Sequence, residues 1–222
     1  MDYVQTNVSF LLLVMLVIPL KKMSIDFVKE PLVFTEDRIL MKRWIIKAPQ
    51  SSAVMERWET PMLQRQIDLL DVKDKDVLEI GFGMGITARM IQKAEPKSHT
   101  IIECHPQVIN YAKSTFPYID KINLVGNFWQ NVIMSMGKFD RIFFDPHMDD
   151  YDAFFQIVDM KLREDGIFSY FHWENFHKAE SFYNVEREPF EITKDFVNGG
   201  QKNIVAQIPI YRKSLGSTFL KN

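Results

Sequence analysis

The chain has 222 residues, of which 46% are hydrophobic and 25% are charged, and its formal net charge is −2. This composition excludes a disordered or fibrous chain, and the length suffices for one well-buried domain with an N-terminal appendage. The charge argues against a nucleic-acid partner, because such proteins carry a basic surplus, and the single cysteine excludes an internal disulfide and suits a reducing compartment.

The N-terminal 22 residues differ from the rest of the chain. Residues 10–20 are almost wholly apolar, which is short for a membrane span of about 20 residues. They also lack the basic start and the small-residue cleavage site of a signal peptide. We therefore interpret residues 1–22 as an extension outside the core, with translation able to begin at Met23, and expect a cytoplasmic location. A membrane anchor formed by residues 8–20 is the alternative.

Downstream we expect a cover segment over residues 23–61 and one domain over residues 62–222. In this domain, apolar residues at helical spacing alternate with short apolar runs typical of strands. Helices are predicted at 62–70, 85–94, 107–114 and 151–161, and strands at 76–80, 101–102, 122–125, 139–144, 167–171, 190–196 and 204–210. Turns are predicted at 164–166 and at 198–200, the latter closing a hairpin. The alternation predicts a Rossmann-like α/β fold: a mostly parallel seven-stranded sheet flanked by helices, with an antiparallel C-terminal strand.

The run from Val77 to Gly85 carries the strongest functional signal. A predicted strand enters a turn with glycines at three alternate positions, which lets the backbone lie against a ligand with no Cβ between them. Glu103 ends the next predicted strand, about 20 residues on, where such folds place a ribose-binding acid. Because parallel strands end at one edge of the sheet, we expect Gly81, Glu103, Asn127 and Asp145 to surround one crevice.

The glycine spacing favours S-adenosylmethionine over a dinucleotide. The phosphate-binding fingerprint needs glycine or alanine where Ile86 stands. The tighter spacing, preceded by Glu79, suits a ligand with an amino-acid end whose cationic group Glu79 would receive. Glu103 would accept hydrogen bonds from both ribose hydroxyls. Cys104 and His105 either line the edge of the adenine ring or have a packing role. The structural alternative for the glycine turn is a tight connection between strand and helix that binds no ligand.

Three separated segments then narrow the class: Val54–Pro61, Val77–Met84 and Ile101–Cys104. In this order they resemble guanidinoacetate N-methyltransferase and its arginine-methyltransferase-like relatives, which are class I S-adenosylmethionine-dependent methyltransferases. The resemblance covers roughly residues 53–171. The first segment is the specific one, since most such methyltransferases share the glycine turn.

The resemblance implies two sets of site residues. The expected S-adenosylmethionine-binding residues are Glu79, Gly81, Phe82, Gly83, Met84, Gly85, Ile86, Glu103, Cys104, His105, Asn127, Phe128 and Asp145. The expected residues for the methyl acceptor are Met55, Glu59, Leu63, Asp145, Glu174 and Asn175. No metal is expected, because the histidines lack ligand spacing.

Glu59 and Asp145 are the expected catalytic carboxylates. A guanidinium is planar with forked donors, so two carboxylates from different elements would fix its orientation. A protonated guanidinium has no free lone pair, so one carboxylate must take its proton as the new bond forms. We assign this role to Asp145 and orientation to Glu59. The alternatives are a helix cap at Asp145 and a surface ion pair of Glu59 with Arg57.

The acceptor is expected to differ from guanidinoacetate. In the family, a threonine–serine pair receives the acceptor's carboxylate, and Glu174-Asn175 stands at that position in this chain. Because Glu174 would repel a carboxylate, we expect a small guanidino or amine compound with a cationic or neutral far end.

Two other functions stay open. The first is methylation of arginine in a protein, which requires an open groove rather than a lid formed by residues 24–61. The second is a cofactor-binding homologue without turnover. Asp145–Met148 is also similar to the D-P-P-aromatic motif of enzymes that methylate exocyclic amino groups, but it lacks the second proline and the aromatic residue.

Membrane contact is expected only through the apolar N-terminus, and a homodimer is a further possibility.

Overall fold

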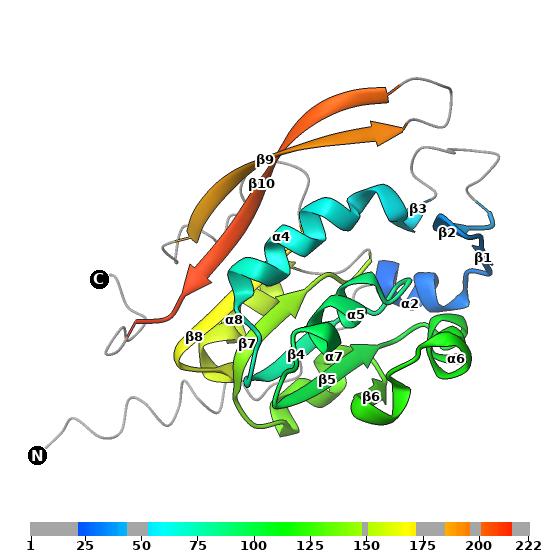
Figure 1. Ribbon diagram of the computed structural model, residues 1–222. Coiled ribbons are helices and arrows are strands. Elements are labelled where there is room, and N and C mark those ends of the chain that lie inside the picture. The colour runs from blue at the N-terminus through cyan, green and yellow to red at the C-terminus, as the bar shows by residue number, and fades with distance from the viewer. Residues whose placement is uncertain (1–21, 44–52, 148–150, 172–184, 196–200, 215–222) are drawn as a thin grey trace, which may run out of the picture.

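The computed structural model describes residues 22–43, 53–147, 151–171, 185–195 and 201–214, and these form an α/β fold around one large sheet (Figure 1). The sheet has the strand order β6-β5-β4-β7-β8-β10-β9. Its strands are β4 (Asp76–Ile80), β5 (Ser98–Glu103), β6 (Asn123–Gly126), β7 (Phe139–Phe144), β8 (Leu162–Tyr170), β9 (Val185–Asp195) and β10 (Gln201–Arg212). β4 to β8 are parallel, whereas β10 is antiparallel to both β8 and β9. The predicted fold class is therefore confirmed.

Helices cover both faces of the sheet. α4 (Thr60–Leu70), α5 (Ile86–Lys93) and α6 (Pro106–Thr115) lie on one face, and α7 (Trp129–Val132) and α8 (Tyr151–Lys161) lie on the other. Short 3₁₀ turns are η2 (Arg57–Glu59), η3 (Ile119–Lys121) and η4 (Ile133–Ser135). Alternate residues of β4 belong to the two separate cores: Val77 to the first, Leu78 and Ile80 to the second. A strand covered on both faces reads as a continuous apolar run, which is why it was recognisable in the sequence.

The order of the strands positions the site. The chain runs outward from β4 to β5 and β6 and then returns to β7 on the other side of β4. In open parallel sheets, ligands bind at the carboxyl ends of the strands where this reversal occurs. The predicted crevice belongs at this point, between the ends of β4 and β7.

The segment before the domain forms a small structure of its own. It consists of α2 (Lys22–Lys29) and the antiparallel strands β1 (Leu32–Phe34), β2 (Arg38–Met41) and β3 (Ala53–Glu56). Polar contacts attach it to the domain: among them, the Leu32 amide donates to Gln107 Oε1 at 2.9 Å, and His105 Nε2 donates to the Glu30 carbonyl at 3.0 Å. These contacts hold the segment beside the carboxyl end of β5.

Two details of the sheet differ from the sequence-based expectation. The predicted turn at residues 164–166 lies inside β8, where Asp165 has a φ of 61°. Leu162 pairs with Phe139 and Ile167 pairs with Arg141, so five steps along β8 oppose two along β7. The extra residues form an irregularity within the strand rather than its beginning. The second strand is also longer than predicted, since β5 includes the polar residues before its apolar centre.

The C-terminal hairpin leaves the sheet and passes over α4 (Figure 1). β9 and β10 pair along eleven positions of β9, whereas β8 pairs only with residues 210–212 of β10. Ile192 and Ile208 of the hairpin belong to the core that contains α4, and Arg65 of α4 pairs with Glu188 at 2.6 and 2.9 Å. The predicted turn at 198–200 lies outside the described residues.

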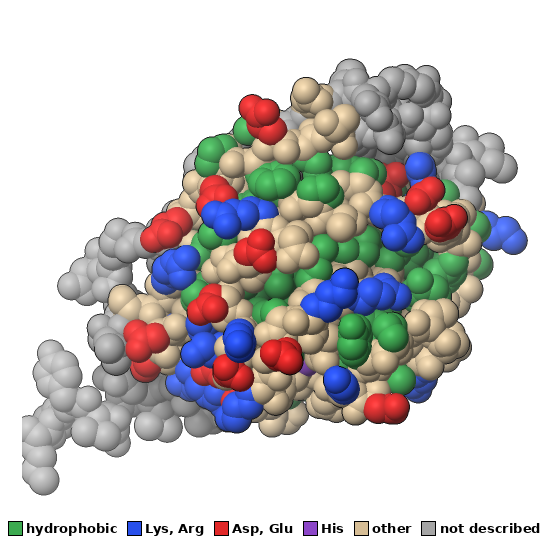
Figure 2. All heavy atoms as spheres, in the orientation of Figure 1, with side chains coloured by type: hydrophobic (Ala, Val, Ile, Leu, Met, Phe, Trp, Pro, Cys, Tyr) green, Lys and Arg blue, Asp and Glu red, His purple; other side chains and the backbone are tan. Residues whose placement is uncertain are grey.

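Acidic and basic side chains are mixed on the face that carries α4 and α5 (Figure 2). This face therefore presents no large field of one sign. In the described part of the chain, no helix combines the length and apolarity needed to cross a membrane. Residues 1–21, which contain the apolar run, are outside that part.

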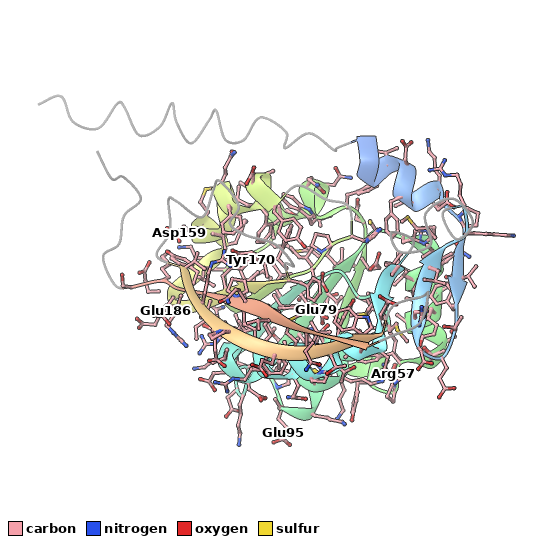
Figure 3. All side chains as sticks on the ribbon, turned by 90° about the horizontal axis from the view of Figure 1, so that it is seen from above. Arg57, Glu79, Glu95, Asp159, Tyr170 and Glu186 are labelled. Carbon is pink, nitrogen blue, oxygen red and sulfur yellow. The ribbon has the colours of Figure 1, made fainter. Side chains whose placement is uncertain are left out.

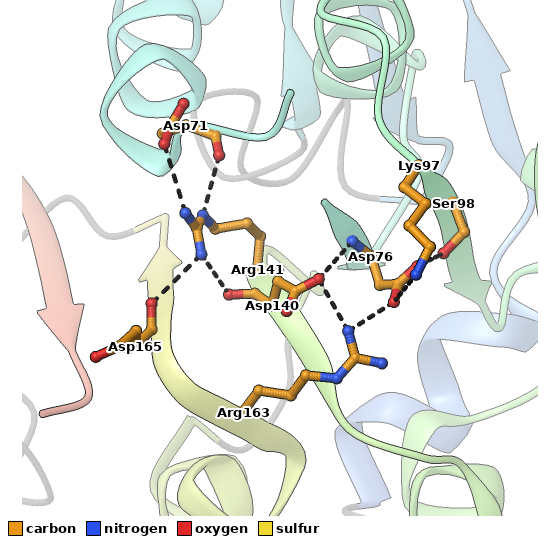
Figure 4. Close-up of polar contacts among 8 residues, drawn as sticks. All are labelled: Asp71, Asp76, Lys97, Ser98, Asp140, Arg141, Arg163 and Asp165. Atoms are coloured by element: carbon orange, nitrogen blue, oxygen red, sulfur yellow. Dashed lines mark hydrogen bonds and ion pairs between the residues drawn. The ribbon is translucent and has the colours of Figure 1, made fainter. Parts of the chain in front are cut away.

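A charged network joins the strands at the end opposite the crevice (Figure 4). Arg163 of β8 donates to Asp76 at 2.6 Å and to Asp140 at 2.9 Å, and Asp140 also accepts from the Asp76 amide at 2.8 Å. Hydrogen bonds from Arg163 and from the Ser98 hydroxyl lower the pKa of Asp76 to about 2. The network fixes the relative positions of β4, β5, β7 and β8 at their starts.

Replacing Arg163 with methionine should lower the free energy of unfolding by about 1 kcal/mol at pH 7, because the guanidinium is partly exposed. The Asp76 pKa is depressed in the folded state, so this contribution is present above about pH 4 and is lost as the pH falls toward 2. Urea unfolding at pH 7 and pH 3 measures the contribution of Arg163 to the free energy of unfolding. The control is Arg212→Met, which removes a more exposed ion pair with Glu186 at 3.7 Å. An equal loss at both pH values would contradict this account.

Candidate functional site

A cavity lies at the carboxyl ends of β4, β5, β6 and β7. Its lining comes from the four strand ends and their following loops, from α6, and from the small structure before the domain. The lining residues are Phe27, Val54, Met55, Ile80, Gly81, Phe82, Gly83, Ile102, Glu103, Cys104, Val108, Asn127, Phe128, Trp129, Asp145, Pro146 and His147. The four residues predicted to surround one crevice, Gly81, Glu103, Asn127 and Asp145, are thus brought together.

The glycine turn forms one wall of this cavity, and two of its glycines are required by geometry. Gly81 has a φ of 91°, and a Cβ there would overlap the carbonyl oxygen of Asp145. Gly83 has a φ of 53°, and its Cβ would lie 2.5 Å from the sulfur of Met55. Residues other than glycine are disfavoured at such φ values, so glycine avoids both the backbone strain and the steric overlap. Both positions line the cavity, and the absence of a Cβ lets Asp145 and Met55 pack directly against the turn.

Glu103 attaches the turn to the end of β5. Its carboxylate accepts from the Phe82 amide at 2.9 Å and from the His105 amide at 2.7 Å. Burial raises the pKa of Glu103, and the backbone N–H groups partly offset that rise. The N–H groups of Cys104 and Gly83 add to this effect, so four backbone donors are directed at the carboxylate.

Asp145 lies opposite the turn, directly after β7. Its amide donates to the Ile80 carbonyl at 2.8 Å, which holds the ends of β7 and β4 together. Burial raises the pKa of Asp145 well above its usual range, and the charges of Glu79 and Glu103 add to the rise. The carboxyl therefore exchanges its proton at a higher pH than an exposed aspartate, which suits a group that accepts a proton during a reaction.

Glu79 is placed differently from the expectation that it contacts the ligand. It is fully buried inside the domain (Figure 3). It does not belong to the cavity lining. Its carboxylate accepts hydrogen bonds from the Thr87 hydroxyl and from His99 Nε2, the latter at 2.9 Å. The side chain leaves the sheet toward α5, because alternate residues of a strand point to opposite faces. Glu79 thus joins β4, β5 and α5, and it acts on the site through its charge on Asp145.

Six other expected residues also lie outside the cavity lining: Leu63, His105, Met84, Ile86, Gly85 and Glu59. Leu63 is fully buried in the core beneath α4, and His105 is buried beside the cavity. His105 Nδ1 accepts from the Gln107 amide at 3.2 Å and caps α6, which favours its structural alternative. Met84 and Ile86 line a separate groove on the α5 side, because the chain turns into α5 at this point. Gly85, the N-cap of α5, is not part of the lining either.

The acceptor residues are only partly within the described chain. Met55 lines the cavity and accepts from the Met84 amide through its sulfur at 3.1 Å. Glu59 is buried in η2 and does not belong to the lining. Its proposed partner in the structural alternative, Arg57, pairs with Asp37 at 3.3 Å. Glu174 and Asn175 lie outside the described residues.

Eight cavity residues were not singled out as site residues from the sequence: Phe27, Val54, Ile80, Ile102, Val108, Trp129, Pro146 and His147. Phe27 carries no local signal, since only the folding of α2 against the domain brings it there. Val54 begins the segment 54–61 that carries the family resemblance, and His147 follows β7 by three positions. His147 had one signal: it lies two residues after a strand-end aspartate.

Two solved methyltransferases have a similar fold. Precorrin-6y C5,15-methyltransferase from Geobacter metallireducens superposes with a TM-score of 0.59 at 16% identity, covering 69% of this chain and 88% of that one. The O-methyltransferase TomG from Streptomyces achromogenes, solved in complex with S-adenosylmethionine, gives 0.53 at 12% identity over 94% and 96% of the two chains. These likenesses show that the chain has the Rossmann-like α/β fold of class I methyltransferases.

Sequence comparison gives the family. The family model described as guanidinoacetate N-methyltransferase matches residues 47–187. The chain therefore belongs to the guanidinoacetate N-methyltransferase family. Protein arginine N-methyltransferase 2 of Yarrowia lipolytica is 32% identical over 165 residues, which cover 67% of this chain and 33% of that protein. The protein of the same name from Saccharomyces cerevisiae is 27% identical over 180 residues, covering 75% and 42%. The chain thus spans well under half the length of these curated relatives.

Replacing Gly81 with alanine should lower the free energy of unfolding by about 2–4 kcal/mol, because the new Cβ meets both strain at positive φ and the Asp145 carbonyl. Calorimetry should also show weaker binding of S-adenosylmethionine. The matched control is Gly137→Ala, whose Cβ meets no atom within 4 Å and which should change stability by less than about 0.5 kcal/mol. Equal effects of the two changes, measured by urea unfolding, would show that the turn does not need glycine at position 81.

Proposed function

We propose that this chain binds S-adenosylmethionine in the cavity and transfers the methyl group to a guanidino nitrogen. The observation that carries the proposal is the placement of the Asp145 carboxylate opposite the glycine turn and Glu103, in one cavity. When bound, the cofactor supplies an electrophilic methyl group on a positively charged sulfur. The protein must then hold the acceptor nitrogen in line with that methyl group and remove a proton.

The residues of the cavity fit the cofactor. The backbone at Gly81 and Gly83 lines the cavity, and the Glu103 carboxylate lies at the end of β5, where this kind of fold places the acid that binds the ribose hydroxyls. Cys104 and Phe128 supply apolar contact for an adenine ring beside β5 and β6. Asn127 already uses its side-chain oxygen for the Phe128 amide at 2.8 Å, which orders the loop that carries both residues.

Asp145 is proposed as the group that takes the proton from the acceptor. A guanidinium must lose one proton as its nitrogen is methylated, and a carboxylate beside it both attracts the cation and receives the proton. Because its pKa is raised, the ionised Asp145 carboxylate accepts a proton more readily than an exposed aspartate does. Glu59 is proposed to orient the acceptor from η2, at the edge of the small structure before the domain.

Arginine in a polypeptide is the acceptor that we favour, because the two relatives described above are both named protein arginine N-methyltransferase 2. A small guanidino compound is the second candidate. Phe27, Val54 and Met55 reach the cavity from the segment before the domain, and such a cover restricts the space beside Asp145. Both acceptors present the same guanidino group to the same carboxylates.

A methyl-transfer screen separates these acceptors. We expect transfer of labelled methyl from S-adenosylmethionine to an arginine-containing peptide, and weaker transfer to agmatine, arginine and guanidinoacetate. Guanidinoacetate should be the poorest, because the sequence carries Glu174-Asn175 where the family has the threonine–serine pair that receives its carboxylate. Binding of S-adenosylmethionine by calorimetry with no transfer to any acceptor would instead support a homologue without turnover. Transfer to polyamines alone would overturn the guanidino assignment.

Replacing Asp145 with asparagine should lower kcat about 10²- to 10⁴-fold, the usual effect of losing a general base. In the unmodified chain, kcat/KM should rise with pH through the pKa of Asp145, because only the ionised carboxylate accepts a proton. That rise should lie at a higher pH than the ordinary aspartate value of about 4 and be absent in the variant. Asp120→Asn, at an exposed position of η3, is the control that should leave kcat unchanged.

A further inference from the structure

His147 lines the cavity but has no place in the reaction described so far. Its Nε2 is buried and has no hydrogen-bond partner within the part of the chain that the structure describes. Buried polar atoms in folded proteins are nearly always hydrogen-bonded, so each exception calls for an explanation. An unpaired nitrogen in the wall of a binding cavity is explained most directly if it contacts a ligand.

The surroundings of His147 place it on one side of the cavity. Its ring packs against Phe27 of α2, with 5.0 Å between the ring centroids. Glu103, Asn127 and the residues that follow them form the β5 and β6 side, which fits ribose and adenine. His147 follows β7 two residues after Asp145, the proposed proton acceptor. Phe27 joins the two sides of the cavity, because its ring centroid also lies 4.9 Å from that of His105 at the end of β5.

The chemistry of this position favours an uncharged acceptor of hydrogen bonds. Burial lowers the pKa of His147 to about 4, so the imidazole is neutral at pH 7 and carries one free lone pair. Asp145, Glu79 and Glu103 already bring three carboxyl groups near one another, and each raises the cost of a further negative charge. A guanidinium has more N–H donors than one carboxylate can accept. The unprotonated nitrogen of a neutral imidazole accepts a hydrogen bond from one of these N–H groups and adds no negative charge to the cavity.

We propose that Nε2 of His147 accepts a hydrogen bond from the guanidino group of the methyl acceptor, which makes His147 a specificity-determining residue. The proposal rests on the function proposed above, because it names one more contact of the same acceptor. It requires the tautomer with hydrogen on Nδ1 when the acceptor is bound.

Two substitutions test it in the full chain. His147→Phe keeps a ring against Phe27 and removes the nitrogen, and it should raise the KM for an arginine-containing peptide about 10- to 100-fold. The dissociation constant of S-adenosylmethionine should stay within about twofold, because the contact is to the acceptor alone. His147→Gln carries a side-chain oxygen near the position of Nε2 and should recover most of the lost kcat/KM. An unchanged KM in His147→Phe, or weaker cofactor binding with an unchanged KM, would overturn the proposal.

A binding experiment separates this inference from the proposed function. The chain loaded with S-adenosylhomocysteine is titrated with ethylguanidine, and the imidazole ¹⁵N signal missing from His147→Phe is followed by NMR. We expect that signal to shift on titration. A shift without methyl transfer to any acceptor would refute the proposed reaction and keep the contact. Methyl transfer without a shift would refute the contact and keep the reaction.

Discussion

The close approach of β4 and β7 at their carboxyl ends is the constraint on which the rest of the site depends. The Asp145 amide donates to Ile80, and the backbone of Gly81 lies so near the Asp145 carbonyl that no Cβ fits between them. This contact sets the distance between the glycine turn and the Asp145 carboxylate. A methyl donor on one side and an acceptor nitrogen on the other must be aligned over that distance, and small errors in such alignment are costly.

The opposite ends of the same strands carry the features that keep this approach rigid. Arg163 bridges Asp76 and Asp140, so β4, β7 and β8 start from fixed relative positions (Figure 4). Between the two ends, both faces of β4 are buried against helices. Because a packed interior resists displacement, the strand ends are held where the chemistry requires them. The site is thus built on strands rather than on loops alone.

The charges of neighbouring carboxyl groups affect the protonation of the cavity residues. Glu79, Glu103 and Asp145 gather near the same strand ends, and burial with mutual repulsion raises the pKa of Asp145. The buried Glu79 is compensated by Thr87 and His99, which leaves Glu103 and Asp145 to serve the cavity. Positive charge on a ligand would relieve this repulsion. A cationic cofactor and a cationic acceptor are therefore both suited to a cavity that is otherwise costly to ionise.

The sheet, the glycine turn and the acids at the strand ends could be predicted from the sequence alone. Apolar runs and positive-φ glycines are local properties, so β4 and the Gly81 turn were readable without a structure. Only the tertiary structure decided that Glu79 faces α5, that Leu63 belongs to the core, and that Phe27 and His147 meet at the cavity. These outcomes depend on contacts between segments far apart in the chain, such as Leu32 with Gln107, and packing of that kind leaves no periodic pattern in either segment.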